Sequence, residues 1–510
     1  METLVLVGIY QIAVTKGSVN ISGAKLSSTS PMQTIYAPMT HALPVIEAHS
    51  SKRKQTTNSS TPSTEIRVTN HYSGILEIGK LCPTFNTIWK GPSKDQGGNS
   101  FASLFTSAVN IPTVTVPTSW KPTLKALTKK VMSPDAPPPI IVLAGSKGAG
   151  KSTFSRILAN RLLTTAGLDS VAYLDVDPGQ PEFSPPGIIS LSVLNSPILG
   201  PPFTHTISPT RSHHIGYTSP REDPAHYIRA IIDLLSVHRQ SHPTVPLLIN
   251  TAGWIKGLGL ELLQDILSHS QATDVVFLSG GAQAVSEIIA PNTAALHELS
   301  SAAAAPSTRF TPADLRTLHT MSYFHRRPSS GWDFTTALTG LAPWVIPYTG
   351  AARGIDGVHI LGETIAAKEL CTAIEGTIVG IVVVAEHNLP ESFTPTPSTT
   401  TGEPVLPAIL DSPLAPEVTE CKGLAVIRAI DSTNGEVHLV SSVAEAEIEE
   451  WERQGGRVVL VRGRLELSVW DMLLPNEATE KKLPWISTGE GKGAGAVWRV
   501  RRNVMRRGQQ

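Results

Sequence analysis

The chain has 510 residues, of which 41% are apolar, so it can form about two to four domains with sizeable hydrophobic cores. Its 42 basic and 42 acidic residues balance, which argues against a protein that binds polyanions over its whole surface and leaves contacts with nucleic acid to local patches. The three cysteines are widely spaced, which argues against a disulfide framework and a zinc ribbon. The sequence has no apolar run as long as a membrane span and no signal-peptide pattern, so we expect a soluble intracellular protein.

The first part of the chain predicts a β domain. Residues 4–7, 10–14, 19–23 and 34–37 are short apolar and β-branched runs separated by turn residues, which is typical of strands. Residues 50–64 are rich in serine, threonine and lysine and read as a solvated loop.

Residues 65–89 indicate ordered structure again, whereas prolines and serines dominate residues 91–139. That composition favours a linker. We therefore expect an N-terminal β domain with a Ser/Pro-rich linker over residues 1–130, followed by a second domain over residues 131–345.

The second domain opens with a strand, a glycine-rich loop and a helix. Residues 140–144 are apolar and β-branched, and residues 145–153 match G-x-x-x-x-G-K-[ST] in full. The residues that follow carry apolar side chains at helical spacing, and Gly167 supplies a stop. Those apolar positions are Phe154, Ile157, Leu158 and Leu162.

This pattern predicts a phosphate-binding loop. Glycines let successive backbone N–H groups point at phosphate oxygens, and the helix N-terminus adds partial positive charge. Lys151 would reach the β- and γ-phosphates, and the Ser152 hydroxyl would bind Mg²⁺. A chance match is the alternative, while a dinucleotide-binding loop would need glycine at Thr153. The loop comprises Gly145, Ser146, Lys147, Gly148, Ala149, Gly150, Lys151, Ser152 and Thr153.

A second strand over residues 171–174 ends in Asp175 and Asp177, which precede Pro178 and Gly179. Carboxylates at this end of a parallel strand can hold Mg²⁺ directly or through water. One of them could instead accept the proton of an attacking hydroxyl. The alternative is a turn, because Asp-Pro-Gly favours turns, although a turn does not require Asp175.

Strands and helices then alternate. Strands are predicted at 188–193, 247–250 and 275–278, with a helix after Asp223-Pro224 and another near residues 258–266. This alternation predicts a parallel sheet with helices on both faces, whose ligands bind at the carboxyl ends of the strands. The phosphate loop, the Asp pair and the loop that follows residue 250 should meet there.

That loop carries Thr251 and Trp254. A tryptophan at the rim of the phosphate site could stack on a terminal base, whereas the alternative is a core side chain. Further on, residues 306–327 contain Arg309 and Arg316 in a segment where a kinase lid would lie. A lid arginine can stabilise the transferring phosphoryl group, and the alternative is a solvated basic helix face.

The last part of the chain, residues 346–510, predicts a mainly β domain. Strands are expected at 377–384, 424–430, 436–440, 458–463 and 465–467, and Asn434-Gly435 is typical of a hairpin turn. Residues 388–418 read as a Pro/Ser/Thr insertion. The C-terminal tail is a basic patch suited to RNA phosphates or to an acidic partner. Its arginines are Arg499, Arg501, Arg502, Arg506 and Arg507.

Other catalytic patterns lack support. His205, His213 and His214 are close in sequence but do not have the spacing of a zinc site. No G-x-S-x-G motif is present, so the sequence gives no support to covalent catalysis through a serine elbow.

Taken together, residues 145–153, 175–187, 200–205 and 251–254 resemble the motifs of the polynucleotide 5′-hydroxyl kinases, in order and in spacing. The resemblance is closer to the branch that acts in pre-ribosomal RNA processing than to the branch in messenger-RNA 3′-end formation. It extends over nearly the whole chain, through residues 2–8, 22–26, 36–38, 428–431 and 499–507.

The resemblance implies an α/β fold in which a P-loop kinase domain with a parallel sheet lies between an N-terminal β domain and a mainly β C-terminal domain. It implies ATP- and Mg²⁺-dependent phosphorylation of the 5′-hydroxyl end of RNA (or DNA), in the nucleus and nucleolus. Family members often carry a long polar N-terminal extension, whereas this chain begins at its first expected strand, so either this lineage lacks the extension or the start lies elsewhere.

The resemblance also assigns roles to residues. Catalysis falls to Lys151, Asp177 and Arg316, with Asp177 activating the hydroxyl. Metal binding falls to Ser152, Asp175 and Asp177, and substrate binding to Gln180, Thr251, Trp254 and Arg309. The expected partner is an endoribonuclease that cleaves the pre-rRNA spacer, in a hetero-oligomer. An ATP-binding scaffold without catalysis is the alternative, and a small-molecule kinase fits the loop but not the flanking domains.

Overall fold

The computed structural model of the chain describes residues 2–48, 64–91, 98–104, 112–133, 136–205, 207–279, 294–302, 310–327, 331–350, 353–363, 365–366, 369–385, 405–409 and 414–472. Within these residues, the strands form three seven-stranded sheets and one two-stranded ribbon. None of the helices in these ranges is both long enough and apolar enough to span a membrane.

The N-terminal sheet is built around β1 (Thr3–Lys16), a single long strand where the sequence predicted two short ones. Gly8 lies in the middle of β1 with φ of +113°, and a Cβ there would be 2.3 Å from the carbonyl oxygen of Ser100. A bend that only glycine tolerates therefore joins the two predicted runs. The other strands are β2 (Ser18–Ile21), β3 (Ala24–Ser27), β4 (Gln33–Ala37), β5 (Val45–Ala48), β6 (Glu65–Asn70) and β7 (Phe101–Ser103).

The linker predicted for residues 91–139 is wrong in two places. β7 pairs antiparallel with β1, and α2 (Trp120–Val131) packs against the central sheet. Trp120 is fully buried, and its indole nitrogen donates a hydrogen bond to the carbonyl of Ser300 over 2.8 Å. Most of the prolines that suggested a linker lie outside these elements, and Pro122 lies in the first turn of α2, where a missing N–H removes no hydrogen bond of the helix. Short helices precede this segment: η1 (Ile75–Glu77), α1 (Ile78–Leu81) and η2 (Pro83–Phe85).

The central sheet has the strand order β11-β10-β9-β12-β8-β13-β14. The five strands from β9 to β14 run parallel, as predicted, whereas β10 and β11 each run antiparallel to their neighbours. The bounds are β8 (Ile140–Gly145), β9 (Val171–Asp175), β10 (Ile188–Leu194), β11 (Arg211–His214), β12 (Leu247–Asn250), β13 (Asp274–Ser279) and β14 (Ala295–Ser300).

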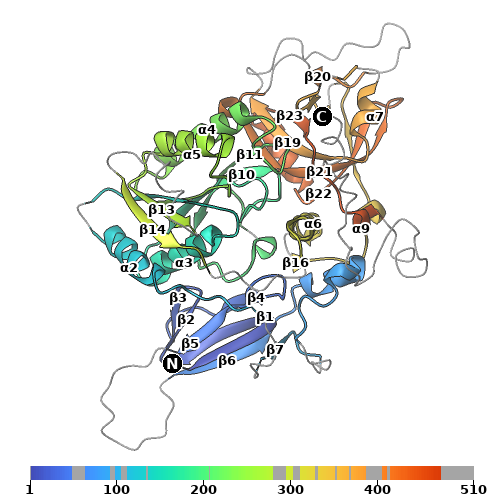
Figure 1. Cartoon of the computed structure of the whole chain (residues 1–510). Helices are drawn as coiled ribbons and strands as arrows, with labels where there is room; N and C mark the ends of the chain where they lie inside the picture. The colour runs from blue at the N-terminus through green and yellow to red at the C-terminus, as the bar shows by residue number, and fades with distance from the viewer. Residues whose placement is uncertain are drawn as a thin grey trace, which may run out of the picture.

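Helices cover both faces of this sheet, as the alternation of strands and helices predicted (Figure 1). α4 (Pro224–Ser241) and α5 (Leu258–Ser270) pack on one face, and α2 and α3 (Lys151–Thr164) on the other. Successive residues of β8 therefore enter different cores, since side chains alternate along a strand. Asp223 caps α4, because its side chain accepts a hydrogen bond from the backbone N–H of His226 over 3.0 Å.

After the central sheet the chain forms α6 (Pro312–Phe324) and the ribbon of β15 (Arg326–Arg327) and β16 (Gly331–Trp332). α6 lies between the central and C-terminal sheets, and β16 lies near the N-terminal part (Figure 1). Tyr323 of α6 accepts a hydrogen bond from the backbone N–H of Leu424, while Ser322 donates one to the carbonyl of Phe203. The helix therefore contacts several parts of the chain at once.

The C-terminal sheet has the order β17-β22-β21-β19-β23-β18-β20 and is mainly antiparallel. The predicted hairpin is confirmed, because β21 and β22 pair around a turn in which Gly435 has φ of +71°. Residues 465–467, predicted to continue the sheet, are not a strand. The strands are β17 (Trp344–Pro347), β18 (Gly357–Ile360), β19 (Ile378–Ala385), β20 (Ala408–Ile409), β21 (Thr419–Asp431), β22 (Glu436–Ser441) and β23 (Gly456–Arg462).

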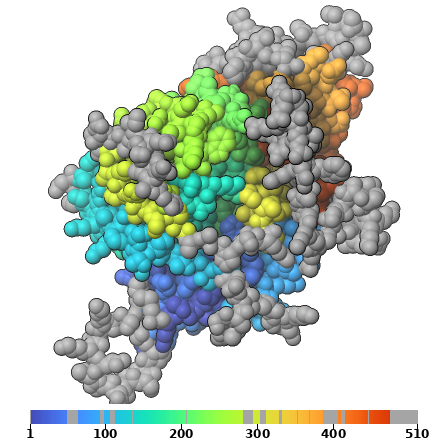
Figure 2. Space-filling view, in the orientation of Figure 1, coloured from blue at the N-terminus to red at the C-terminus, as the bar shows by residue number. Residues whose placement is uncertain are grey.

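Short helices complete the described chain: η3 (Pro202–Thr204), η5 (Leu338–Gly340), α7 (Leu370–Ile374), η9 (Pro416–Val418), α8 (Glu445–Arg453) and α9 (Val469–Met472). In the space-filling view the N-terminal part lies at the bottom, the C-terminal part at the upper right and the central sheet with its helices between them (Figure 2). Most of the predicted 388–418 insertion and the whole arginine-rich tail lie outside the described residues.

Candidate functional site

The phosphate loop connects the carboxyl end of β8 to the N-terminus of α3, as the motif predicted. Gly150 has φ of +102°, and a Cβ there would be 2.9 Å from the Trp120 ring and from Ala302, so the last turn of the loop requires glycine. α3 then begins at Lys151. Its free N–H groups and dipole therefore face the position that phosphates occupy in such loops.

A cavity of about 430 Å³ lies over this loop and brings most of the predicted site residues together. It is lined by Lys147, Gly148, Gly150, Lys151, Ser152, Thr153, Asp177, Gln180 and Arg316. Of the remaining loop residues, Gly145, Ser146 and Ala149 shape the loop behind this lining. Arg309 lies outside the described residues, so its predicted role in substrate binding stays a prediction.

Lys151 is buried at the base of the cavity. Its ammonium group donates hydrogen bonds to the carbonyls of Gly145 at 2.9 Å and Ser146 at 3.1 Å. Burial lowers the pKa of Lys151 to about 8, although the nearby Asp177 carboxylate favours the charged form. A lysine in this environment gains from an anionic ligand, because such a ligand compensates the charge that burial destabilises.

Asp177 faces the same cavity as Lys151. Its Oδ1 accepts hydrogen bonds from the backbone N–H groups of Gly179 at 3.0 Å and Gln180 at 3.3 Å. Burial raises the pKa of the Asp177 carboxyl, while those two N–H groups and Lys151 oppose the rise. The Asp-Pro-Gly turn and the functional carboxylate, which the sequence left as alternatives, are thus both present. The turn itself presents the carboxylate to the cavity.

Asp175 is placed differently from the prediction. It is fully buried at the end of β9, outside the cavity lining. Its Oδ1 accepts bonds from the Asp177 N–H and the Asn250 amide, both at 3.2 Å, and its Oδ2 accepts one from the Glu182 N–H at 2.5 Å. Burial and the neighbouring Asp177 raise the pKa of Asp175 to about 8. This side chain holds the backbone that carries Asp177, so a direct bond to a metal would require those hydrogen bonds to break.

The predicted magnesium site can be tested against these positions. Mg²⁺ prefers a few hard oxygen ligands together with phosphate oxygens and water. Ser152 offers a hydroxyl and Asp177 a carboxylate, and both line the cavity beside the phosphate loop. These two residues fit the ion, whereas Asp175 fits only as a residue that positions Asp177.

The loop after β12 reaches the cavity through Gly253 and not through the residues predicted for substrate binding. A Cβ at Gly253 would lie 2.7 Å from the Cα of Lys147, so glycine lets this loop pass against the phosphate loop. The Thr251 hydroxyl is buried and donates to the carbonyl of Leu143 at 2.7 Å. Trp254 is 39% exposed and lies beside a separate small pocket near α5.

Arg316 lines the cavity from the first turns of α6, so the lid region predicted for residues 306–327 contains a regular helix. Thr311 caps this helix. Its hydroxyl accepts the N–H of Asp314 at 3.2 Å, and the Asp314 carboxylate accepts the N–H of Thr311 at 2.7 Å. This capping box holds the helix end that carries Arg316.

A buried ionic cluster in the cavity wall was missed at the sequence level. Glu182 lies 2.8 Å from Arg156 of α3 and 2.8 Å from His205. Burial alone would raise the pKa of Glu182, but Arg156 and His205 lower it to about 2. His41 and His319 complete this wall, and burial lowers the pKa of each to about 3. One sequence signal could have indicated this cluster: Arg156 follows Ser152 by one helical turn, so the two residues lie on the same face of the predicted helix.

Comparisons with known proteins agree with this geometry. The model of the mRNA cleavage and polyadenylation factor CLP1 P-loop matches residues 145–326. Among solved structures, a wild-type Clp1p–Pcf11p complex is similar, with a TM-score of 0.54 and 13% identity over 90% of this chain and 95% of that chain. A second, on the Pcf11p–Clp1p interface and ATP loss in a glycine-to-arginine mutant, gives a TM-score of 0.55 and 14% identity over 90% and 96%. These two structures confirm the three-part fold.

The curated relatives are more similar in sequence. The polynucleotide 5′-hydroxyl-kinase grc3 of Aspergillus clavatus is 31% identical over 92% of this chain and 66% of that protein. The Aspergillus terreus protein of the same name is also 31% identical, over 92% and 67%, and that of Gibberella zeae is 29% identical over 92% and 69%. The chain spans about two thirds of the length of these relatives. The chain belongs to the Grc3 polynucleotide 5′-hydroxyl-kinase family.

Proposed function

We propose that this protein transfers the γ-phosphoryl group of ATP to the 5′-hydroxyl end of RNA. The observation that carries the proposal is that Lys151 of the phosphate loop and the carboxylate of Asp177 line one cavity. The names of the relatives support polynucleotide 5′-hydroxyl ends as the acceptor. The similar Pcf11p–Clp1p structure, which concerns ATP loss in a point mutant, supports ATP as the donor.

The residues of the cavity suggest how the reaction proceeds. Backbone N–H groups of the phosphate loop and the start of α3 bind the β- and γ-phosphates, and Lys151 neutralises charge on the transferring group. Asp177 accepts the proton of the 5′-hydroxyl through Oδ2, because both of its backbone hydrogen bonds go to Oδ1. Gln180 and Gly253, which flank Asp177 and the phosphate loop, border the space for the acceptor.

Two further groups support phosphoryl transfer. Arg316 lines the cavity from α6, where its guanidinium can stabilise the transferring group as arginines do in related phosphotransferases. Ser152 and Asp177 would hold Mg²⁺, which neutralises phosphate charge when bound. Asp175 orients Asp177 through the backbone.

The biological setting is also part of the proposal. We infer an RNA substrate from pre-ribosomal spacer processing, an endoribonuclease partner that generates the 5′-hydroxyl, and a location in the nucleus and nucleolus. The names of the Grc3 relatives support the branch of the family in which these expectations arise. The basic tail of residues 499–507 stays a prediction for contact with RNA or with the nuclease.

A transfer assay tests the proposal. Purified protein is incubated with γ-labelled ATP, Mg²⁺ and a 5′-hydroxyl oligoribonucleotide, with and without the nuclease partner. We expect label at the 5′ end of the RNA, and none on an oligonucleotide that already carries a 5′-phosphate. ATP binding without transfer in either condition would instead support the catalytically silent scaffold.

A further inference from the structure

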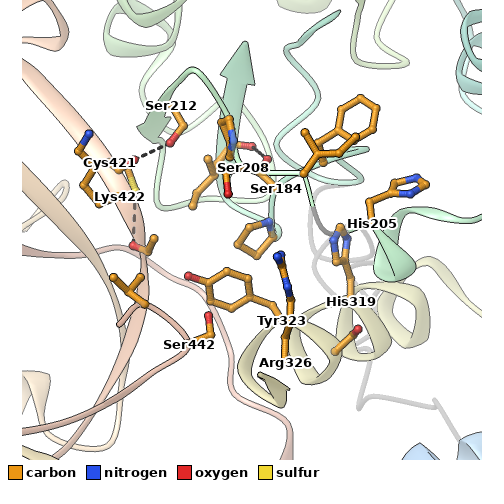
Figure 3. A pocket seen from close by; sticks show the side chains of 18 of the residues that line it. Ser184, His205, Ser208, Ser212, His319, Tyr323, Arg326, Cys421, Lys422 and Ser442 are labelled. Atoms are coloured by element: carbon orange, nitrogen blue, oxygen red, sulfur yellow. Dashed lines mark hydrogen bonds between the residues drawn. The ribbon is translucent and has the colours of Figure 1, made fainter. Parts of the chain in front are cut away.

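A second cavity, of about 410 Å³, lies between α6, the central sheet and the C-terminal sheet (Figure 3). Figure 3 shows His319, Tyr323 and Arg326 extending from the α6 side, while Cys421 and Lys422 belong to the C-terminal sheet opposite. The proposed chemistry does not use this space. It nevertheless borders the phosphate cavity, because Phe203 and His319 line both cavities.

Two continuous stretches of chain run from one cavity into the other. Along residues 177–188, Asp177 and Gln180 line the phosphate cavity, whereas Phe183 and Ser184 line the second cavity. α6 also runs from one cavity to the other. Side chains three or four residues apart lie on one face of a helix, and along this face Arg316 lines the phosphate cavity and Tyr323 the second cavity. From Arg316 to Tyr323 the helix advances about 10 Å, which corresponds to about three nucleotides at the 3.4 Å rise of a duplex strand.

The walls of the second cavity combine cations, ring faces and hydroxyls. Lys422 lies 5.6 Å from the centre of the Trp451 ring and 2.6 Å from Glu420. Glu420 is also 3.5 Å from Arg211, so its negative charge is compensated twice. Glu447, the other carboxylate of the wall, is exposed, where solvent and salt screen its charge.

Arg326 supplies a further positive charge. Its guanidinium is partly buried in β15, just after α6, and burial lowers its pKa from the ordinary value. A phosphate beside this group would offset the loss of hydration. The cavity thus combines the Arg326 guanidinium, the Trp451 ring and the hydroxyls of Ser208 and Ser442. These groups match a nucleic-acid strand, which offers one phosphate and one stacking base per nucleotide.

We propose that the second cavity binds the acceptor strand just downstream of the 5′-hydroxyl nucleotide. In this assignment Arg326 contacts a backbone phosphate and Trp451 stacks on a base, while the 5′ end reaches Asp177 along α6 and residues 177–188. The proposal rests on the proposed kinase function, and it adds a subsite that makes phosphorylation depend on acceptor length.

The experiment compares acceptors that differ only in length. The full chain is assayed with ATP and a series from a nucleoside 3′-monophosphate to an oligoribonucleotide several nucleotides long. We expect kcat/KM to rise with length and then level off, mainly through KM. In Arg326→Ala the ratio of kcat/KM for the longest to the shortest acceptor should fall about tenfold, the loss expected for one charge-assisted phosphate contact. Trp451→Ala, on the opposite wall, should lower the same ratio.

Arg327→Ala is the matched control, because Arg327 adjoins Arg326 in β15 but does not line the cavity, so it should keep the parent ratio. An oligoribonucleotide with a photoreactive base near its 5′ end should also crosslink to Tyr323 or Trp451. A ratio that both cavity variants leave intact overturns the inference and favours a protein segment as occupant, while the kinase proposal stands. Failure of the parent protein to phosphorylate any acceptor overturns both.

Discussion

Asp177 combines a cavity position with a carboxyl whose pKa is raised by burial, which suits a group that accepts a proton near neutral pH. Replacing it with asparagine keeps the shape and removes the proton acceptor. We predict that Asp177→Asn lowers the rate of label transfer by about 10²–10⁴-fold, the usual contribution of a general base. ATP binding, measured by equilibrium dialysis, should persist.

Asp169→Asn provides the control for that variant, because Asp169 is an exposed carboxylate in the loop before β9. This variant should transfer label at the parent rate. If Asp177→Asn matches the parent, Asp177 is not the base and the mechanism proposed above is wrong.

Glu182 gives a prediction about pH. Its folded pKa of about 2 is lower than the ordinary 4.5, so the charged carboxylate stabilises the fold above pH 4.5, and this contribution is lost as the pH falls toward 2. Glu182→Gln should therefore lower the apparent Tm at neutral pH, by about 2–4 °C for each kcal/mol lost. The difference from the parent should shrink as the pH falls below 4.5.

Thermal melts of the parent and of Glu182→Gln across this pH range measure that difference. Glu261→Gln, at an exposed position in α5, should change the Tm little at any pH. A gap between parent and Glu182→Gln that stays constant down to pH 2 would contradict the assigned ion pair with Arg156.

At the scale of elements, the capping box of Thr311 and Asp314 stabilises the first turn of α6. Thr311→Ala leaves the N–H of Asp314 without that partner and should destabilise the helix start by about 1 kcal/mol. We expect faster amide hydrogen exchange in residues 313–316, and slower phosphoryl transfer because Arg316 is held less firmly.

Thr317→Ala is the comparison for this change, since it lies in the interior of the same helix, where alanine favours helix formation. It should leave both measurements near the parent values. Equal exchange in the two variants would show that packing alone fixes the helix start.

Local sequence patterns predicted the central helices and strands well. They failed where the pairing of one strand with another decides the secondary structure or its direction. The strand, loop and helix around residues 140–164 were confirmed, because glycines and helical spacing act over a few residues. β14 was missed, since its Ala, Leu and Glu favour helices and only its alignment with β13 makes it a strand. β10 is antiparallel because the chain between β9 and β10 contains no crossover helix.

The site shows the same division. The phosphate loop was predictable because its motif contains all the residues that act together. Asp177 could be named because it follows the end of the next strand, although the sequence left a functional carboxylate and a turn as alternatives there. The positions of Asp175 and Trp254 were not, because a strand end does not reveal which side chains turn inward and which reach the cavity. The cluster of Glu182, Arg156 and His205 joins three separate segments of chain, and no local pattern links them.

At the scale of the whole molecule, a buried pair ties the end of the described chain to α6. His325 and Asp471 of α9 are both fully buried, with 2.8 Å between Nε2 and Oδ1, and Nδ1 of His325 is 2.9 Å from the carbonyl of Asp333. We predict that Asp471→Ala destabilises the protein by about 3–5 kcal/mol, because it leaves a buried partner unpaired.

Thermal unfolding and limited proteolysis measure this effect, and cleavage near α9 should appear at lower protease concentration. Glu466→Ala, an exposed neighbour in sequence, should behave as the parent protein does. An unchanged Tm in Asp471→Ala would mean that packing around Phe334 and Leu338 anchors this segment without the pair.

Because α6 supplies His319 to the walls of both cavities, a ligand that shifts this helix changes two pockets at once. Thermodynamic linkage makes such an effect reciprocal. If bound nucleotide raises the affinity of the protein for an oligonucleotide, the bound oligonucleotide must raise its affinity for nucleotide by the same factor. The order in which the two ligands arrive would then leave the affinity of the ternary complex unchanged, and would alter only the route by which it forms.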